Sequence, residues 1–400
     1  MKKTNLTMLV DFYEITMANG YFLSGKGDDI ATFDLFFRNL PSGSGYAIMA
    51  GVEQGVEYLS ELEFADEDIE YLRGKGIFDD KFLDYLKNFK FECDVWAVPE
   101  GTPIFPREPI LVVRGPVIQA QLVETMLLLT INHQSLIATK ANRIVRAAQG
   151  RPVFEFGTRR AQGVSAAVLG ARSTYIGGCA GTACTIADQE FRVPAMGTMA
   201  HSWVQSFENE YEAFKAYAQS YPDNAVLLVD TYNVLKSGVP NAIKVFDEYK
   251  PINKGIRIDS GDVTYLTRCA RKMLDNAGHE DCKIVVSNSM DEYIIRDVLL
   301  QGAQIDSFGV GEKLITSKPD PVFGGVYKLS TIMRNGTAVP TLKVSENLDK
   351  ITDPGFKKVY RLFDNNSGKA IADVITLADE VIDDSKPYTI FDPRAIWKKK

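Results

Sequence analysis

The spacing of apolar residues changes along the chain, from a mixed pattern in the first 150 residues to a regular one after them. Residues 9–22 have helical periodicity, and residues 31–38 alternate as a strand does, with Phe33, Leu35 and Phe37 on one face. The glycine- and proline-containing stretch that follows is typical of a loop. We therefore expect an α/β domain at the start of the chain.

From residue 150 onward, strand-like runs alternate with loops and helical stretches. Repeated β–α units imply parallel strands joined by right-handed crossovers. About seven such units indicate an incomplete (β/α) barrel, and a doubly wound open sheet is the alternative. The runs end at or near Phe156, Gly178, Met199, Asp230, Asp259, Ser287 and Gly309.

Three further segments complete the predicted domain organisation. Residues 95–113 contain several prolines between short apolar runs, which favours edge strands and turns. The strand pattern returns near residue 320, beyond the barrel units. Because 400 residues exceed the size at which one core keeps growing, we predict two domains. The first is an α/β domain of residues 1–120 completed by residues 322–400, and the second is the catalytic barrel of residues 121–321.

Composition excludes several classes of protein. A net charge of −7 argues against nucleic-acid binding, which needs a basic surface. No apolar run approaches the roughly 20 residues that cross a bilayer, and acidic residues near the N-terminus argue against a secretory signal. Five scattered cysteines fit free thiols in a reducing compartment, so we expect a cytoplasmic protein.

In a parallel β/α barrel, catalytic groups lie where strands end and loops begin. One of the chain's three histidines, His201, is at such a place, beside the hydroxyls of Thr198 and Ser202. No second histidine or CxxC pair is near it in sequence, which favours a nucleophile or an acid/base over a metal ligand. A histidine with a purely structural role is the alternative.

Glycines and hydroxyls at the later strand ends suggest a phosphorylated substrate. Gly309 and Gly311 would let backbone N–H groups approach a phosphate, although such glycines are often simple turns. Two further loops with hydroxyl or amide side chains strengthen the phosphate interpretation. These are Ser260-Gly261 and Ser287-Asn288-Ser289.

Charged residues at the strand ends allow two interpretations each. Arg257 and Asp259 lie two apart on a strand and so share a face, either as an ion pair or as site residues. Asp230 and Asp259 could hold Mg²⁺ through its water shell together with substrate phosphates, or could cap helices. Arg159 fits an anion clamp, although one of the adjacent pair Arg159-Arg160 usually faces solvent.

Taken in order, these motifs resemble the nicotinate phosphoribosyltransferases, which join nicotinate to phosphoribosyl pyrophosphate with ATP hydrolysis. The resemblance runs almost from end to end. It includes Asp11-Phe12-Tyr13-Glu14-Ile15-Thr16-Met17, residues 33–51, Glu155-Phe156-Gly157-Thr158-Arg159-Arg160, residues 197–202, residues 257–262, residues 308–311 and residues 324–329.

The resemblance implies a homodimer with shared active sites, and it assigns a role to each motif. His201 would be the histidine that ATP phosphorylates. Asp259 would be the second catalytic residue, with its carboxylate near the ribose. Tyr13 from the other subunit and Phe156 would stack on the pyridine ring, with Thr198 and Arg257 near its carboxylate. The expected phosphoribosyl pyrophosphate ligands are Arg159, Ser260, Gly261, Ser287, Asn288, Gly309 and Gly311, with Mg²⁺ on the phosphates and ATP as co-substrate.

Two positions depart from the patterns of related enzymes. Nicotinamide-using relatives place an aspartate shortly after the Gly-Thr that corresponds to Gly181-Thr182, whereas this chain has Ala183. A pocket without that carboxylate would not repel nicotinate. Glu312 replaces a small hydroxyl residue after Gly311, which leaves its contact with phosphate open. Two alternatives to a nicotinate phosphoribosyltransferase stay open: a nicotinamide phosphoribosyltransferase and a non-catalytic metabolite-binding protein on the same fold.

Overall fold

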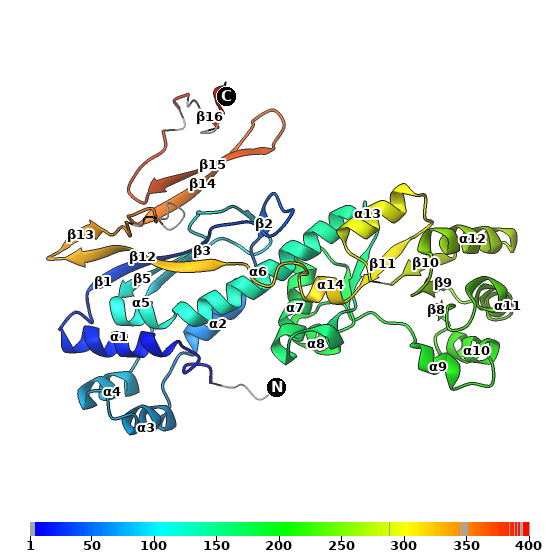
Figure 1. Ribbon diagram of the computed structural model, residues 1–400, viewed down its shortest axis with the longest axis horizontal. Coiled ribbons are helices and arrows are strands. Elements are labelled where there is room, and N and C mark those ends of the chain that lie inside the picture. The colour runs from blue at the N-terminus through cyan, green and yellow to red at the C-terminus, as the bar shows by residue number, and fades with distance from the viewer. Residues whose placement is uncertain are drawn as a thin grey trace.

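The computed structural model describes residues 5–287, 289–344, 346, 351–383, 385–387, 389, 391–392 and 395–399. Two parts lie on opposite sides of a long helix, α6 (Glu124–Ala147), which runs between them (Figure 1). The α/β N-terminal domain, its completion by C-terminal strands and the incomplete barrel are all confirmed. No helix among the described residues is long and apolar enough to span a membrane.

The N-terminal part is built on a five-stranded sheet in the order β13-β12-β1-β5-β3, with every pair antiparallel. Two of its strands come from the far end of the sequence: β12 pairs with β1, the first strand of the chain, and β13 pairs with β12. The strands are β1 (Ile30–Phe37), β3 (Asp94–Ala97), β5 (Leu111–Pro116), β12 (Gly325–Arg334) and β13 (Thr337–Pro340).

Helices and two short strands surround this sheet. The helices are α1 (Phe12–Leu23), α2 (Val52–Ser60), α3 (Asp66–Gly74), α4 (Asp80–Lys87) and α5 (Val117–Leu122), and the short pair is β2 (Ala47–Ile48) and β4 (Pro103–Ile104). One hydrophobic core joins these helices to the sheet and includes Tyr327 of β12.

Strand β1 does not have the one-sided burial that its alternating sequence predicts. Seven of its eight residues are buried, including Asp34, so both faces of the strand are covered, while β12 and β5 pair with its two edges. The ring of Phe33 stacks on Tyr327 at 4.9 Å, and the Tyr327 hydroxyl donates to the Ala120 carbonyl at 2.7 Å. The buried Asp34 carboxylate pairs with Lys357 Nζ at 2.6 Å, which offsets part of the cost of its burial, and burial still raises the pKa of Asp34.

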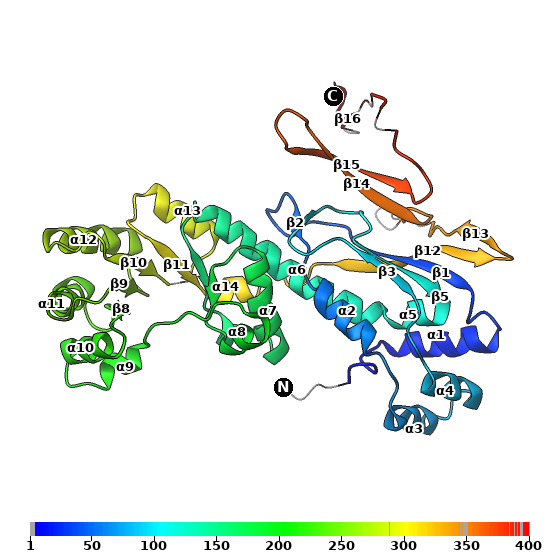
Figure 2. The same ribbon diagram turned by 180° about the vertical axis from the view of Figure 1, so that it is seen from behind.

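The second part is a curved sheet of six parallel strands in the order β7-β6-β11-β10-β9-β8. Helices α10–α12 lie outside strands β8–β10 (Figure 2). The strands are β6 (Val153–Glu155), β7 (Gly181–Thr182), β8 (Asn224–Leu228), β9 (Asn253–Ile258), β10 (Lys283–Val286) and β11 (Ser307–Val310). The helical segments are η1 (Thr158–Arg160), α7 (Val164–Ile176), α8 (Thr185–Phe191), α9 (His201–Gln205), α10 (Glu210–Ser220), η2 (Val234–Gly238), α11 (Val239–Tyr249), α12 (Val263–Asn276), α13 (Glu292–Leu300) and α14 (Glu312–Ile315).

The unit after β9 shows how local sequence fixes these boundaries. Asp262 caps α12 by accepting from the Tyr265 backbone N–H at 3.0 Å, as its position before the helix predicts. Beyond Asn276 the chain turns at Gly278, whose φ of +81° is costly for a residue with a side chain. The helix thus begins directly after the loop that contains Asp259 and Ser260.

Two of the expected strands are wrong. The apolar run near Gly178 is the end of helix α7, and the strand follows at Gly181. The run near Met199 contributes only an isolated parallel bridge between Ala195 and Thr182. Small residues and Pro194 make that run too irregular for a full strand, so β7 and β8 are not joined and the barrel stays open.

The remaining described segments form two hairpins. Strand β14 (Lys357–Phe363) pairs with β15 (Ala370–Leu377), and β16 (Phe391–Asp392) pairs with β17 (Ala395–Lys399). The first hairpin projects away from the barrel on the side of the N-terminal sheet (Figure 1). The five cysteines are free thiols.

Candidate active site

Most of the polar side chains predicted for the site meet where β8, β9 and β10 end. The parallel registers pair Leu228 with Arg257, and Val286 with Ile258, so these strands end at one edge. Residues that immediately follow the strands therefore lie side by side in space.

Arg257 is the centre of this cluster, and 15 % of its side chain is exposed. Its Nε donates to the Ser287 hydroxyl at 2.6 Å, and its Nη1 donates to the Thr198 hydroxyl at 2.9 Å and to the Met199 carbonyl at 3.3 Å. The guanidinium carbon lies 5.7 Å from the centre of the Phe156 ring, within the range of a cation–π contact. A fixed cation beside an aromatic ring suits a planar, anionic ligand.

Asp259 shares the hydroxyl that Arg257 uses. The Ser287 hydroxyl donates to Asp259 Oδ1 at 2.7 Å, and Arg257 Nη2 lies 3.4 Å from the same oxygen. Both interpretations of Arg257 and Asp259 therefore hold. The two residues form an ion pair, and they also belong to the cluster at the strand ends.

The imidazole of His201 faces two carboxylates. Its Nε2 lies 3.8 Å from Asp259 Oδ2 and 4.0 Å from Asp230 Oδ1, and its Nδ1 is 3.1 Å from the Thr231 hydroxyl. About 41 % of the His201 side chain is exposed, so a reagent in solution can reach the ring. The arrangement combines an accessible imidazole with negative charge on one side.

Asp230 is almost completely buried at the base of the cluster, with 1 % of its side chain exposed. Its Oδ2 accepts from the Asp259 backbone N–H at 3.0 Å and from the Ser260 hydroxyl at 2.6 Å, so it orders the loop after β9 and does not cap a helix. Its Oδ1 is buried and has no hydrogen-bond partner among the residues that the structure describes. A buried, unpaired carboxylate oxygen suits an acceptor for a cation or a proton.

Asp230 and Asp259 could supply only some of the ligands of a Mg²⁺ ion. Among the described residues, no group of three or more His, Cys, Asp or Glu side chains could hold a metal ion. The unpaired Asp230 Oδ1 is nevertheless of the right chemistry, because Mg²⁺ usually keeps several waters and binds one or two carboxylates plus substrate phosphates. Asp230 and Asp259 are thus suited to hold the ion through water beside a phosphorylated ligand.

The glycine of β11 is required by packing. A Cβ atom on Gly309 would lie 2.4 Å from Cδ2 of Phe156 and 3.0 Å from the Ser287 Cβ. At Gly311 a Cβ would lie 3.2 Å from the Phe156 carbonyl oxygen. Gly261 has a φ of +86°, which only glycine adopts without strain. Gly309 therefore determines where the aromatic ring beside Arg257 can lie.

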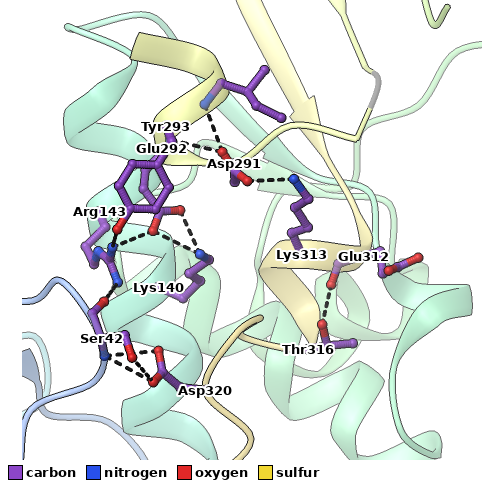
Figure 3. Close-up of polar contacts among 11 residues, drawn as sticks. Ser42, Lys140, Arg143, Asp291, Glu292, Tyr293, Glu312, Lys313, Thr316 and Asp320 are labelled. Carbon is purple, nitrogen blue, oxygen red and sulfur yellow. Dashed lines mark hydrogen bonds and ion pairs between the residues drawn. The ribbon is translucent and has the colours of Figure 1, made fainter. Parts of the chain in front are cut away.

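Three residues singled out from the sequence lie outside this cluster, and a fourth cannot be placed. Arg159 lies on η1 and is exposed, and Asn288 lies outside the described residues. Tyr13 is on α1, which is at the opposite end of the molecule from β8–β11 (Figure 1). Glu312 is exposed, and its main-chain carbonyl accepts from the Thr316 hydroxyl at 2.7 Å, while Figure 3 shows its carboxylate directed away from the neighbouring Lys313.

Two residues of the site were not singled out from the sequence. Thr231 contacts His201 Nδ1, and its position directly after Asp230 at a strand end was the available signal. Glu155 is fully buried, accepts from the Thr182 hydroxyl at 2.6 Å and from the Gly157 N–H, and has a pKa raised by burial. Because Glu155 bridges the ends of β6 and β7, it fixes the loop that holds Phe156.

Three family models match the chain. The nicotinate phosphoribosyltransferase (NAPRTase) N-terminal domain matches residues 8–132, the NAPRTase family matches residues 152–372, and the NAPRTase C-terminal domain matches residues 356–400. Together these matches extend over both parts of the fold and include the cluster at the strand ends.

Individual relatives agree with these models. The chain is 45 % identical over 394 residues to a nicotinate phosphoribosyltransferase of Bacillus subtilis (strain 168), which covers 98 % of this chain and 80 % of that protein. The Homo sapiens enzyme is 32 % identical over 435 residues, covering 94 % and 80 %. The crystal structure of human nicotinic acid phosphoribosyltransferase matches with a TM-score of 0.80 at 31 % identity, covering 93 % of this chain and 82 % of that chain. The chain therefore belongs to the nicotinate phosphoribosyltransferase family and is a phosphoribosyltransferase enzyme.

Proposed function

We propose that the protein transfers the phosphoribosyl group of phosphoribosyl pyrophosphate to nicotinate, coupled to ATP hydrolysis through a phosphorylated His201. Nicotinate mononucleotide and pyrophosphate would be the products, as a step of NAD salvage. The observation that carries the proposal is the separation of two groups within one cluster. Arg257 with Phe156 suits nicotinate, whereas His201 with Asp230 and Asp259 suits phosphoryl transfer.

The chemistry of ribosyl transfer supports these roles. Departure of pyrophosphate from the ribose C1 builds positive charge on the sugar, so that step needs no covalent nucleophile from the protein. Positioning and charge stabilisation can provide most of the rate enhancement. The carboxylate of Asp259, one third of which is exposed, suits the developing positive charge. His201 is then available for a separate reaction with ATP.

The surroundings of His201 suit a phosphate acceptor. In the transfer the imidazole nitrogen attacks the γ-phosphorus, the bond to the β-phosphate oxygen breaks, and ADP leaves. A phosphoryl group on Nε2 would lie close to Asp230 and Asp259, so a cation is needed to offset the repulsion. Mg²⁺ held by these carboxylates through water would supply that charge.

We further propose that phosphoribosyl pyrophosphate is bound by Ser260, Gly261, Ser287 and the loop of Gly309 and Gly311. Arg159 and Asn288 belong to the same proposal. The supporting observation is that Ser260 and Ser287 lie on neighbouring loops of one cluster, linked by Asp230 and Asp259. Hydroxyls and glycine backbone at such loops suit phosphate oxygens.

A homodimer would complete the site. Tyr13 is 45 % exposed on α1, remote from the barrel strands of its own chain (Figure 1), so stacking on the pyridine requires Tyr13 of a second copy. The free thiols of the five cysteines support a reducing, cytoplasmic setting for this assembly.

The choice of nicotinate over nicotinamide rests on Ala183. This residue follows the buried Thr182, and its backbone N–H donates to the Glu155 carbonyl at 2.8 Å. Ala183 has no carboxylate that could accept a hydrogen bond from the amide of nicotinamide. For the same reason it does not repel the carboxylate of nicotinate. A non-catalytic binding protein is disfavoured by the accessible imidazole and its two carboxylates.

The deciding assay presents nicotinate or nicotinamide to the purified protein with phosphoribosyl pyrophosphate, with and without ATP. We expect mononucleotide from nicotinate, formed faster when ATP is hydrolysed. Preference for the amide would reject the choice of substrate, and binding without turnover would reject catalysis. Mass spectrometry after incubation with ATP should find an acid-labile phosphate on the peptide that contains His201.

A further inference from the structure

A pocket of about 460 Å³ lies away from the strand ends, at the junction between the two parts of the molecule. Its walls come from the loop of Gly43, Ser44 and Gly45 and from the facing helices α6 and α13. None of its lining residues belongs to the candidate active site. Its volume is within the range of small-molecule sites, about 300–1,000 Å³.

The floor of this junction pocket has an excess of positive charge. Glu292 is the only acidic residue among those that line it. Its buried carboxylate lies 2.7 Å from Lys140 Nζ and 2.6 Å from Arg143 Nη2 (Figure 3). Two cations share one carboxylate, so one positive charge remains uncompensated at the floor.

Two more arginines line the pocket at its rim. Arg146 is one turn beyond Arg143 on α6, and it forms no ion pair with any of the described residues. Arg296 is one turn beyond Glu292 on α13 and pairs with Asp297 at 2.9 Å, an exposed contact of the kind that contributes little. Both guanidinium groups are therefore available to an anion.

An aromatic ring lies among these cations. The guanidinium carbons of Arg143 and Arg296 are 5.8 and 5.9 Å from the centre of the Tyr293 ring. The ring is held in place because Arg143 Nη2 donates to the Tyr293 hydroxyl at 3.0 Å (Figure 3). Tyr293 is 47 % exposed, so part of its face can receive a planar group.

The opposite wall offers a hydroxyl donor. Ser44 Oγ is buried and has no hydrogen-bond partner among the described residues. The loop is anchored at Ser42, because Arg143 Nη1 donates to the Ser42 carbonyl and the Ser42 hydroxyl donates to Asp320 at 2.7 Å. Gly43 has a φ of +72°, and a Cβ there would lie 2.8 Å from Arg143 and Tyr293. The wall is thus built closely around the arginine.

We propose that this junction pocket binds a small nucleotide, with Arg146 and Arg296 contacting its phosphate and Tyr293 stacking on its base. Arginine forms strong paired hydrogen bonds to phosphate, and base–aromatic stacking tolerates any base. The site is distinct from the catalytic cluster and does not depend on the proposed reaction. It gives the enzyme a second place at which a phosphorylated metabolite can bind.

AMP is a suitable probe, because it is neither substrate nor product of the proposed reaction. We expect isothermal titration calorimetry on the full-length protein to detect binding of AMP. Adenosine lacks the phosphate and should bind more weakly by about tenfold or more. The double variant Arg146→Ala/Arg296→Ala should weaken AMP binding by about tenfold or more. The matched control is Arg268→Ala, an exposed arginine of α12 that does not line the pocket, and it should bind AMP as the wild type does.

A second comparison separates the pocket from the catalytic cluster. Arg257→Ala should leave AMP binding unchanged, because Arg257 is not among the pocket residues. The proposal is overturned if the wild type binds no AMP up to about 1 mM. It is also overturned if the double variant keeps full affinity, or if Arg257→Ala removes binding, since AMP would then occupy the catalytic cluster. Each of these results is independent of whether nicotinate is the substrate.

Discussion

Nε2 of His201 lies 3.8 Å from Oδ2 of Asp259, while Oδ1 of the same aspartate accepts from Ser287. One carboxylate thus separates the imidazole from the hydroxyl that Arg257 also binds. The distance is too long for a direct hydrogen bond, so the imidazole nitrogen is not held by this carboxylate. Two reactions can therefore use one aspartate without sharing a nucleophile.

Removal of the histidine should separate these reactions. In His201→Ala we expect ATP hydrolysis and the acid-labile phosphate to disappear, while slow ATP-independent transfer of the phosphoribosyl group remains, because bond formation at C1 does not use the imidazole. Product formation measured with and without ATP, together with phosphoprotein analysis, tests this. Loss of both activities in a folded variant would mean that His201 also acts in the ribosyl step.

Arg257→Ala should weaken nicotinate binding by about 1.5–3 kcal/mol, as expected for hydrogen bonds to a charged group. Arg257→Lys should restore little of the affinity, because one ammonium cannot reproduce the contacts to both Ser287 and Thr198. Titration of nicotinate against each variant measures the effect, with Arg268→Ala as the control. Unchanged affinity in Arg257→Ala would place the carboxylate of nicotinate elsewhere.

Gly309→Ala should displace the Phe156 ring, because the new Cβ would lie 2.4 Å from its Cδ2. We expect nicotinate affinity to fall by about tenfold while the fold is retained, since loss of ring stacking costs on the order of 1 kcal/mol. The control is Gly74→Ala on α3, where a Cβ meets no atom within 4 Å. Equal affinities in the two variants would show that the position of the ring is unimportant for binding.

The stability of the protein should depend on the protonation of Glu14. Glu14 is fully buried on α1, one oxygen accepts from the Thr125 hydroxyl at 2.5 Å, and the other has no partner among the described residues. Burial is the largest cause that raises its pKa from 4.5 to about 7, and the charges of Glu124 and Asp11 add to the shift. The buried Tyr58 also faces this carboxyl group.

Between pH 4.5 and about 7 the folded protein keeps a proton on Glu14 that the unfolded chain releases. The contribution of this group to stability is therefore complete below pH 4.5 and is lost as the pH rises to 7. Glu14→Gln removes the effect, so the variant should be more stable than the wild type at pH 8 by about 1–3 kcal/mol and equally stable near pH 4.5. Urea unfolding at both pH values measures this, with the exposed Glu63→Gln as the control. A gain in the stability of Glu14→Gln that did not depend on pH would contradict the prediction.

The junction between the two parts should be sensitive to loss of Glu292. In Glu292→Gln the buried Lys140 and the partly buried Arg143 lose their shared carboxylate. We expect the free energy of unfolding to fall by about 3–5 kcal/mol, the usual cost of an uncompensated buried charge. Lys283→Met, which breaks the exposed pair with Asp306, should change it little. Similar small losses in both variants would mean that water solvates the junction cations.

The sequence predicted the cluster well where regular β–α units determine it. Arg257 lies near the end of β9, Asp259 follows that strand and Ser287 follows the adjacent β10. In a parallel sheet such residues must share an edge. The prediction needed only the order of strands and loops. The same reasoning did not identify Glu155, because its role depends on a hydrogen bond between β6 and β7 that no spacing reveals.

Expectations based on one strand or residue in isolation were less successful. The alternation of β1 indicates one apolar face, but both faces are buried, and the face of Asp34 is contacted by Lys357 from far along the chain. The run near Met199 had the composition of a strand without the neighbour that would pair with it. The expected contribution of Tyr13 from a second subunit stays a prediction, because Tyr13 is on α1, which lies away from the strands of the cluster (Figure 1).

The missing pair between β7 and β8 affects how His201 is held. In a closed barrel each strand-end loop is supported by strands on both sides. Here residues 196–200 lead from a single bridge at Ala195 to helix α9, and their described attachments to the sheet include the bonds from Arg257 to Thr198 and Met199. The segment before His201 is thus held to the sheet in part by a site residue, so Arg257 helps to place the imidazole as well as the hydroxyl of Thr198.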